Sequence, residues 1–184
     1  MLYIIISYLL GTILFAGIVG KLKKVNLQNE NSGNLGARNA GRTLGKWAFA
    51  IVAVGDALKG FLVVIIGRAL EFSEPTIAFA VIAVTLGHLY PFWNKGRGGK
   101  GVATIVGAML AFSPLYILVL LASFLVSMLA TKSATLSMVI SFVLYGVVIS
   151  IVMPAGIILS IALIFVLWKQ RKSIMERVRP HVLE

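Results

Sequence analysis

The chain has 184 residues, of which 59% are hydrophobic and only 12% are charged, and its mean hydropathy is +0.99. Soluble domains carry about 25% charged residues, so the composition excludes a water-soluble globule, and it is too apolar for a disordered chain. The net charge is +11, and cysteine is absent, which excludes disulfides and thiolate metal sites. We therefore expect one domain, residues 1–184, of an integral membrane protein with a basic aqueous face.

Five long apolar segments follow one another along the chain: 2–20, 47–67, 75–93, 102–131 and 133–168. Only the second contains formal charges, at Asp56 and Lys59. A spanning helix needs about 20 apolar residues. The pattern therefore predicts an all-α protein that crosses the membrane several times.

Most Lys and Arg residues lie in three segments outside these runs: 21–46, 94–101 and the tail 169–184. Basic loops remain in the cytoplasm, which places these segments and the C-terminus inside and the N-terminus outside. The short loop 68–74 contains Glu71 and Glu74 beside Arg68 and suits the outside.

The number of helices follows from parity and from the proline breaks. With 94–101 and the tail both inside, residues 102–168 must cross an even number of times. Ser113-Pro114 and Met153-Pro154 divide this stretch into four helices. We therefore expect about seven transmembrane helices, and five is the alternative. Residues 102–112 are too short for a full span and would start from a buried loop.

The first of two glycine-rich loops lies on the basic side. It offers backbone freedom at glycines, neutral donors and acceptors, and a guanidinium that suits phosphate. The residues that would bind an anion here are Ser32, Gly33, Asn34, Gly36, Asn39 and Arg42. The alternative is a flexible basic loop that only obeys the positive-inside rule.

The second loop is a Gly-Gly-Lys-Gly turn that leads directly into a helix. Free backbone N–H groups, the positive end of the helix dipole and an ammonium group would converge there on one phosphate. The candidate residues are Gly98, Gly99, Lys100, Gly101 and Thr104. The spacing is not that of a Walker A loop, and the alternative is again a basic cytoplasmic turn.

Three ionisable residues lie within or near the spans. Asp56 and Lys59 are three residues apart, so they share a helical face and can pair; they either join a helix to a loop or act in the site. His88 lies near the cytoplasmic end of the third span, before the break that we expect at Tyr90-Pro91, as a hydrogen-bonded structural residue or a catalyst. No group of residues has metal-ligand spacing, and we expect no cofactor and no metal.

These motifs resemble those of the bacterial acyl-phosphate:glycerol-3-phosphate acyltransferases, the PlsY family. Residues 32–39 read SGNLGARN, followed by Arg42, and are similar to the family's SGNPGATN and arginine. Residues 87–104 match GHxxPxxxxxxGGKGVAT at every specified position, and Asp56 and Lys59 match the family's DxLKG element.

The resemblance implies a seven-helix enzyme of the bacterial plasma membrane, with its active face in the cytoplasm. It would transfer a fatty acyl group from acyl phosphate to the 1-hydroxyl of sn-glycerol 3-phosphate, giving lysophosphatidate and phosphate for phospholipid synthesis. Membrane lipids would surround it, and the synthase that makes acyl phosphate would be its functional partner. In this interpretation the first loop binds glycerol 3-phosphate and the second binds acyl phosphate. Lys100 and His88 are the catalytic candidates, with Asp56, Lys59 and Arg171 in support.

Four positions depart from the family motifs. Leu35 replaces a proline and Arg38 a threonine, while Gln170 and Ser173 stand where the third motif, RHRxNI, has histidine and asparagine. The competing class is a transporter or channel for a phosphorylated solute; the small size and the absence of repeats argue against it. A nucleic-acid partner is not expected, because the basic residues lie in short loops beside the membrane, where lipid head groups account for them.

Overall fold

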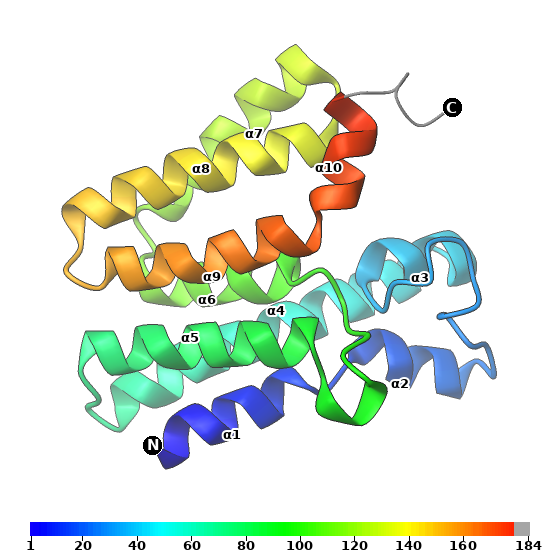
Figure 1. Ribbon diagram of the computed structural model, residues 1–184, viewed down its shortest axis with the longest axis horizontal. Coiled ribbons are helices and arrows are strands. Elements are labelled where there is room, and N and C mark those ends of the chain that lie inside the picture. Colours follow the sequence, from blue (N-terminus) through cyan, green and yellow to red (C-terminus); the bar gives the residue numbers. More distant parts are fainter. Residues whose placement is uncertain (179–184) are drawn as a thin grey trace. The chain divides into compact units, whose positions relative to one another are not determined.

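The computed structural model describes residues 1–178 and, over that range, consists of helices and connecting loops (Figure 1). The elements are α1 (Leu2–Gly11), α2 (Phe15–Leu22), α3 (Ala37–Leu44), α4 (Lys46–Ala69), α5 (Glu74–Leu89), η1 (Phe92–Asn94), α6 (Val102–Phe112), α7 (Ile117–Thr131), α8 (Ala134–Val152), α9 (Gly156–Lys169) and α10 (Arg171–Val178). The predicted all-α fold is confirmed. The end of the predicted cytoplasmic tail, residues 179–184, lies outside the described residues.

Four segments of the described chain are long and apolar enough to cross a membrane: Leu2–Leu22, Lys46–Ala69, Glu74–Asn94 and Ala134–Val152. Three shorter apolar helices lie next to the predicted proline breaks: α6 ends before Ser113-Pro114, α7 begins after it, and α9 begins after Met153-Pro154. The helix predicted over 102–112 is α6, and it begins directly after the Gly-Gly-Lys-Gly turn. The count of seven crossings and the orientation of the termini remain predictions.

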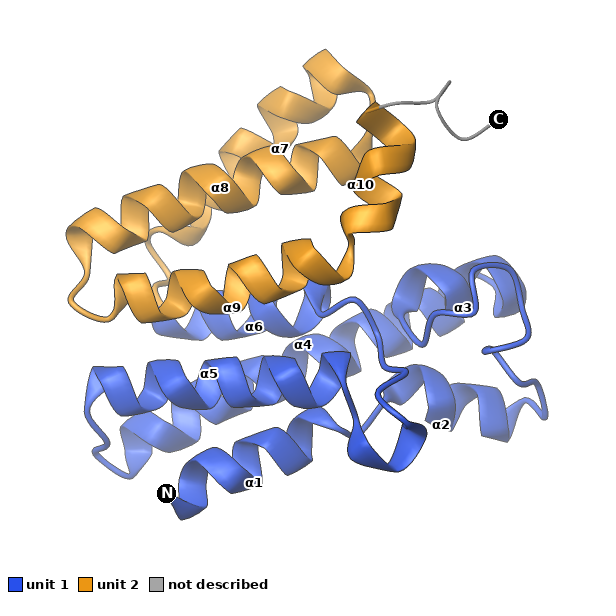
Figure 2. Ribbon diagram, viewed as in Figure 1, with its two compact units in different colours: residues 1–112 blue, residues 113–184 orange. Residues whose placement is uncertain are grey.

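The chain forms two compact units, Met1–Phe112 and the residues from Ser113 onward (Figure 2). In the first unit α4 packs against α6, and α1 packs against α5. In the second, α8 packs against both α7 and α9. The expectation of a single domain remains a prediction.

Glycines allow very close helix crossings in the first unit. A Cβ atom at Gly60 of α4 would lie 1.9 Å from the carbonyl oxygen of Thr104, and one at Gly107 of α6 would lie 2.0 Å from that of Ala57. The pair α1 and α5 has the same arrangement at Gly11 and Gly87. Small residues at crossings let helix backbones approach in membrane proteins. The crossing at Gly60 brings the first turn of α6 next to the middle of α4.

Helix α4 exposes apolar side chains and buries two charged ones among small and apolar residues. Its exposed large side chains recur every three or four residues, at Ile51, Val54, Leu58, Leu62 and Ile65. Asp56 and Lys59, in contrast, are each only 2% exposed. This arrangement is the reverse of a helix on a soluble protein, and it fits a helix that faces lipid on one side.

The first apolar segment, expected as one run over 2–20, is interrupted. Helix α1 ends at Gly11 and α2 begins at Phe15, so residues 12–14 lie outside both helices. Unpaired backbone groups are costly at membrane depth unless protein groups satisfy them. The donors that satisfy the carbonyls of this interruption come from α4 and from η1, as described below.

Candidate functional site

The second glycine-rich loop folds back on the end of α5. The Gly98 N–H donates to the carbonyl oxygen of Leu89 at 3.3 Å, and the Gly99 N–H donates to that of His88 at 3.0 Å. The last carbonyls of a helix need donors from outside the helix, and these two glycines supply them. Both amides are therefore engaged within the protein, and the binding of acyl phosphate by this turn remains a prediction.

The start of α6 keeps the features of a phosphate cradle. Gly101 adopts φ +80°, which turns the chain into the helix, and the first amides of any α-helix lack intrahelical acceptors. Thr104 is fully buried, and its hydroxyl has no hydrogen-bond partner among the described residues. Lys100 is half-buried at the same turn. The amides, the helix dipole and a cation thus meet at one place, as an anion site requires.

Asn39 shapes the first loop from within. It is 2% exposed, and its Nδ2 donates to the carbonyl oxygen of Leu27 at 2.8 Å. Its Oδ1 accepts hydrogen bonds from the backbone N–H and the hydroxyl of Ser32, both at 3.2 Å. Gly33 has φ +64°, which only glycine adopts readily. The side chain of Asn39 therefore holds the loop closed, and Ser32 lies exposed beside it.

Helix α3 presents two arginines beside this loop. Arg38 and Arg42 are both exposed and are four residues apart, so they lie on one face of the helix. Arg38 is the position at which the sequence departs from the threonine of the family motif. The departure adds a second guanidinium one turn before Arg42.

The two loops meet within the first unit. A Cβ atom at Gly99 would lie 2.9 Å from the carbonyl oxygen of Leu35. Leu35 itself is buried in an apolar cluster with Leu27 and Ala40, which fixes the first loop at this contact. The structure thus brings together the two motifs that the sequence singled out, at Leu35 and Gly99, which are 64 residues apart in the sequence.

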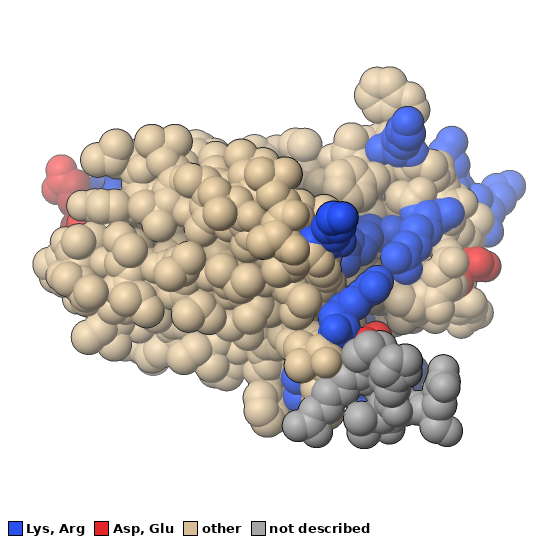
Figure 3. Space-filling model, turned by 90° about the horizontal axis from the view of Figure 1, so that it is seen from above, with Lys and Arg blue, Asp and Glu red and all other residues tan. Residues whose placement is uncertain are grey.

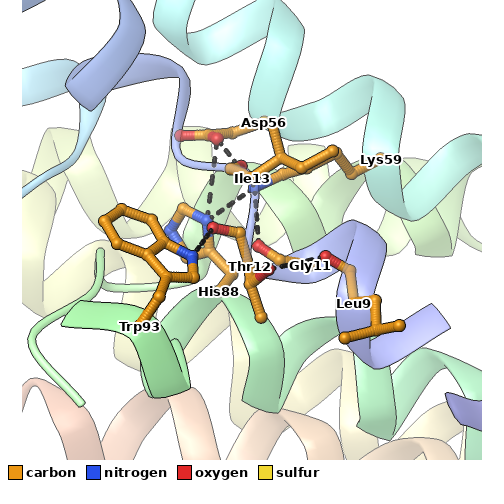
Figure 4. A network of polar contacts seen from close by, with 8 residues as sticks. All are labelled: Leu9, Gly11, Thr12, Ile13, Asp56, Lys59, His88 and Trp93. Atoms are coloured by element: carbon orange, nitrogen blue, oxygen red, sulfur yellow. Dashed lines mark hydrogen bonds and ion pairs between the residues drawn. The ribbon is translucent and has the colours of Figure 1, made fainter. Parts of the chain in front are cut away.

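A buried network of charged and polar groups lies beneath the second loop (Figure 4). The Lys59 ammonium lies 3.0 Å from Asp56 Oδ1 and 2.9 Å from His88 Nδ1. It also donates to the carbonyl oxygens of Gly11 at 3.2 Å and Ile13 at 2.6 Å. Of the two roles left open for the pair, the structure shows the joining of a helix to its neighbours.

Trp93 holds the interruption between α1 and α2, a role that the sequence analysis did not predict. Its Nε1 donates to the carbonyl oxygen of Thr12 at 3.0 Å, which ties η1 to the interruption between α1 and α2 (Figure 4). The signal in the sequence was the Gly-Thr pair inside an otherwise uniform apolar run. A cavity of about 780 Å³ adjoins this place and is lined by apolar residues of α2, by Lys21 and Lys24, and by Trp93.

The third predicted motif belongs to the second unit. Gln170 is 5% exposed, and its Nε2 lies 3.1 Å from Met138 Sδ. Arg171 is exposed and lies over the ring of Trp168, and Ser173 is half-buried. Position 170 is therefore turned into the interior of its own unit.

Charge is distributed unevenly along the helices. In the first unit, exposed Lys and Arg side chains lie on α2, on α3 and at the start of α4, and Figure 3 shows Lys and Arg side chains beside a surface that is mostly uncharged. Among residues 1–178 no group of three His, Asp or Glu side chains is placed to hold a metal ion. The candidate site is thus a positively charged site that suits an anion and lies beside apolar helices.

Comparisons with known proteins agree with this description. The sequence model of the family described as Glycerol-3-phosphate acyltransferase matches residues 1–179. A Bacillus cereus protein described as Glycerol-3-phosphate acyltransferase 1 is 47% identical over 126 residues, which cover 68% of this chain and 69% of that protein.

Two solved structures are similar to the whole fold. The glycerol 3-phosphate form of PlsY (YgiH), an integral membrane glycerol 3-phosphate acyltransferase, has a TM-score of 0.88 and 30% identity, and covers 97% of this chain and 92% of that one. The lysophosphatidic acid form of PlsY has a TM-score of 0.86, 29% identity and coverage of 97% and 91%. With the family model matched almost throughout and two glycine-rich loops joined beside a helix start, this multi-pass membrane protein belongs to the glycerol-3-phosphate acyltransferase family.

Proposed function

We propose that this protein transfers a fatty acyl group from acyl phosphate to the 1-hydroxyl of sn-glycerol 3-phosphate. The products are lysophosphatidate and inorganic phosphate. The observation that carries the proposal is the contact of the two glycine-rich loops at Leu35 and Gly99. Both substrates carry a phosphate, and two adjoining anion sites hold them within reach of each other.

The first loop and α3 bind glycerol 3-phosphate in this proposal, and the second loop binds acyl phosphate. Ser32, Asn34 and Arg42 offer side-chain donors, while Gly33, Gly36 and Asn39 keep the first loop in shape. Lys100, Thr104 and the first amides of α6 receive the phosphoryl group of the donor. Gly98, Gly99 and Gly101 set the position of that turn.

The reaction needs charge neutralisation and positioning more than proton transfer by the protein. The substrate hydroxyl oxygen bonds to the acyl carbon, the bond between that carbon and the phosphate oxygen breaks, and phosphate leaves with the electron pair. Lys100 and the helix dipole stabilise the departing phosphate, and the adjoining sites supply proximity. A substrate phosphate accepts the hydroxyl proton. His88, whose Nδ1 is held by Lys59, is the protein group that otherwise could.

An assay with purified protein in detergent tests this function. Acyl phosphate and glycerol 3-phosphate should give lysophosphatidate and phosphate in equal amounts without metal, nucleotide or CoA. The competing function, transport of a phosphorylated solute, predicts flux into proteoliposomes without product. Flux alone would refute the proposal.

We also propose seven crossings of the bacterial plasma membrane, with the N-terminus outside and both loops in the cytoplasm. A synthase that makes acyl phosphate then delivers the donor on the same side. The exposed basic side chains of α2, α3 and the start of α4 support this orientation. In the naturally cysteine-free chain, cysteines placed singly at Glu71 and Lys95 should be labelled from opposite sides of intact cells. Labelling from one side would contradict the topology.

A further inference from the structure

The network of Asp56, Lys59 and His88 is buried among apolar helices, where a charged group costs the most free energy. All three residues are 2% exposed within apolar helices. Replacing a buried ion pair by apolar residues of similar size is often neutral or stabilising, so packing alone does not account for charges here. Charges within membrane spans are commonly paired and functional, and the contacts of this network show what it holds in place.

Lys59 holds the interruption between α1 and α2. Its ammonium donates to the carbonyl oxygens of Gly11 and Ile13, and Trp93 donates to the carbonyl oxygen of Thr12 between them. All three carbonyls therefore have donors, as backbone groups at membrane depth require. Since Trp93 lies in η1, this interruption and the start of the second loop are tied together.

Lys59 and Asp56 also hold the His88 ring in place. The Lys59 ammonium lies 2.9 Å from His88 Nδ1, and Asp56 Oδ1 lies 3.6 Å from the same nitrogen. Asp56, 3.0 Å from the ammonium, keeps the charge of Lys59 balanced. The ring is thereby fixed at one edge, with its other edge toward the second loop.

The second loop rests directly on this ring. A Cβ atom at Gly99 would lie 2.0 Å from His88 Nε2, so no side chain larger than hydrogen fits between them. The amides of Gly98 and Gly99 are bonded to the carbonyls of Leu89 and His88. A displacement of the His88 ring would therefore move the turn that leads to Lys100 and α6.

We infer that Lys59, balanced by Asp56, is a positioning residue that acts through His88 to fix the phosphate-binding turn at residues 98–101. It does this without touching the substrate. The inference rests on the proposed function only for its kinetic consequence, because the effect on the turn can be measured without any substrate.

The kinetic test compares cations at two places on α4. Lys59→Met should raise the KM for acyl phosphate about tenfold and leave kcat within about threefold, since a loosened turn weakens ground state and transition state alike. Arg68 is the matched control, because it also donates to two backbone carbonyls, those of Ala111 and Phe112, both at 2.7 Å. Arg68→Met should lower stability and leave this KM unchanged.

Lys59→Met leaves Asp56 buried without its partner. If this variant does not fold for that reason, a second variant still tests the inference. Asp56→Leu combined with Lys59→Met removes both charges, and it should fold and show the same rise in KM. A rise in KM confined to Lys59→Met, or of equal size in Arg68→Met, would overturn the inference.

The substrate-free measurement uses the absence of cysteine. Ala103 is half-buried in the first turn of α6, so the thiol labelling rate of Ala103→Cys reports how tightly the turn is held. Adding Lys59→Met, or the double change, should raise that rate at least fivefold, and adding Arg68→Met should not. An unchanged rate refutes the inference even where acyl transfer is observed. A raised rate in a protein without acyl transfer supports it and refutes the proposed function instead.

Discussion

The two units hold polar groups among apolar helices in different ways. In the first unit, Lys59 reaches carbonyl oxygens 46 and 48 residues away in the sequence. In the second unit, hydroxyl groups bond partly within their own helix, as when Ser127 donates to the carbonyl of Ser123, and partly to the neighbouring helix, as when Ser160 donates to the carbonyl of Gly146. Local bonds form wherever the helix forms, whereas charges need partners that only tertiary structure supplies. The first unit should therefore be the one in which single substitutions have large consequences.

The helix crossings at Gly60 and Gly146 differ in a related way, although the second unit also has a close backbone contact at Gly156, where an added Cβ would lie 1.8 Å from the carbonyl oxygen of Ile149. At Gly60 in the first unit, an added Cβ would meet the backbone of Thr104 at 1.9 Å. At Gly146 in the second unit, an added Cβ would meet side-chain atoms of Leu163 and Ser160 at 3.3 and 3.5 Å. Flexible side-chain ends can adjust to a methyl group, but two helix backbones can only separate.

The largest effect is expected for Gly60→Ala. Separating α4 from α6 should lower the free energy of unfolding by about 3 kcal/mol, the upper part of the range for overpacked sites, and should displace Thr104. The control is Gly146→Ala, which should change stability by no more than about 1 kcal/mol. Thermal unfolding in detergent measures both, and equal losses would contradict the proposed difference between the units.

The next effect concerns the cation at the start of α6. Lys100→Ala should lower kcat/KM about 30-fold, or about 2 kcal/mol of transition-state stabilisation, with the fold retained. Lys95 is an exposed lysine of the same loop, and Lys95→Ala should stay within about twofold of the native protein. If both variants kept native activity, Lys100 would serve only the topology of the chain.

A smaller effect is expected on α3. Arg38→Thr restores the residue of the family motif and removes one of two guanidinium groups on the exposed face shared with Arg42. The KM for glycerol 3-phosphate should rise about threefold at low salt, and the rise should fade as salt screens exposed charge. Arg38→Lys keeps the charge and should lie in between. A salt-independent change would point to altered loop structure instead.

The smallest effect is expected for a hydroxyl of the second unit. Ser160 donates to its own helix at Gly156, to the carbonyl of Gly146 at 3.1 Å, and shares a 2.8 Å bond with Ser150. Ser160→Ala should lower stability by about 0.6 kcal/mol, the average found for hydrogen bonds between membrane helices, without a change in kcat/KM. A loss as large as that for Gly60→Ala would show that the second unit also depends on long-range polar contacts.

The sequence by itself determined the helices, the breaks and the motifs. Uninterrupted apolar runs predicted the membrane helices, and Ser113-Pro114 and Met153-Pro154 marked the ends of α6 and α8. These features are local, because helix formation and proline breaks depend on neighbours within a few residues. The motif spacing also singled out both loops and the pairing of Asp56 with Lys59, now seen at 3.0 Å.

Only the tertiary structure determined which polar groups form hydrogen bonds and which groups are their partners. The amides of Gly98 and Gly99, expected to be free, cap α5, and the side chain of Asn39 is engaged within its own loop. The interruption at residues 12–14 contains no proline, and its donors are Lys59 and Trp93, the latter 81 residues from Thr12. Residue pattern reveals that a group can donate or accept, but the partner is whichever group the packed chain brings within about 3 Å. That choice depends on helix crossings set by glycines far apart in the sequence, which no local pattern encodes.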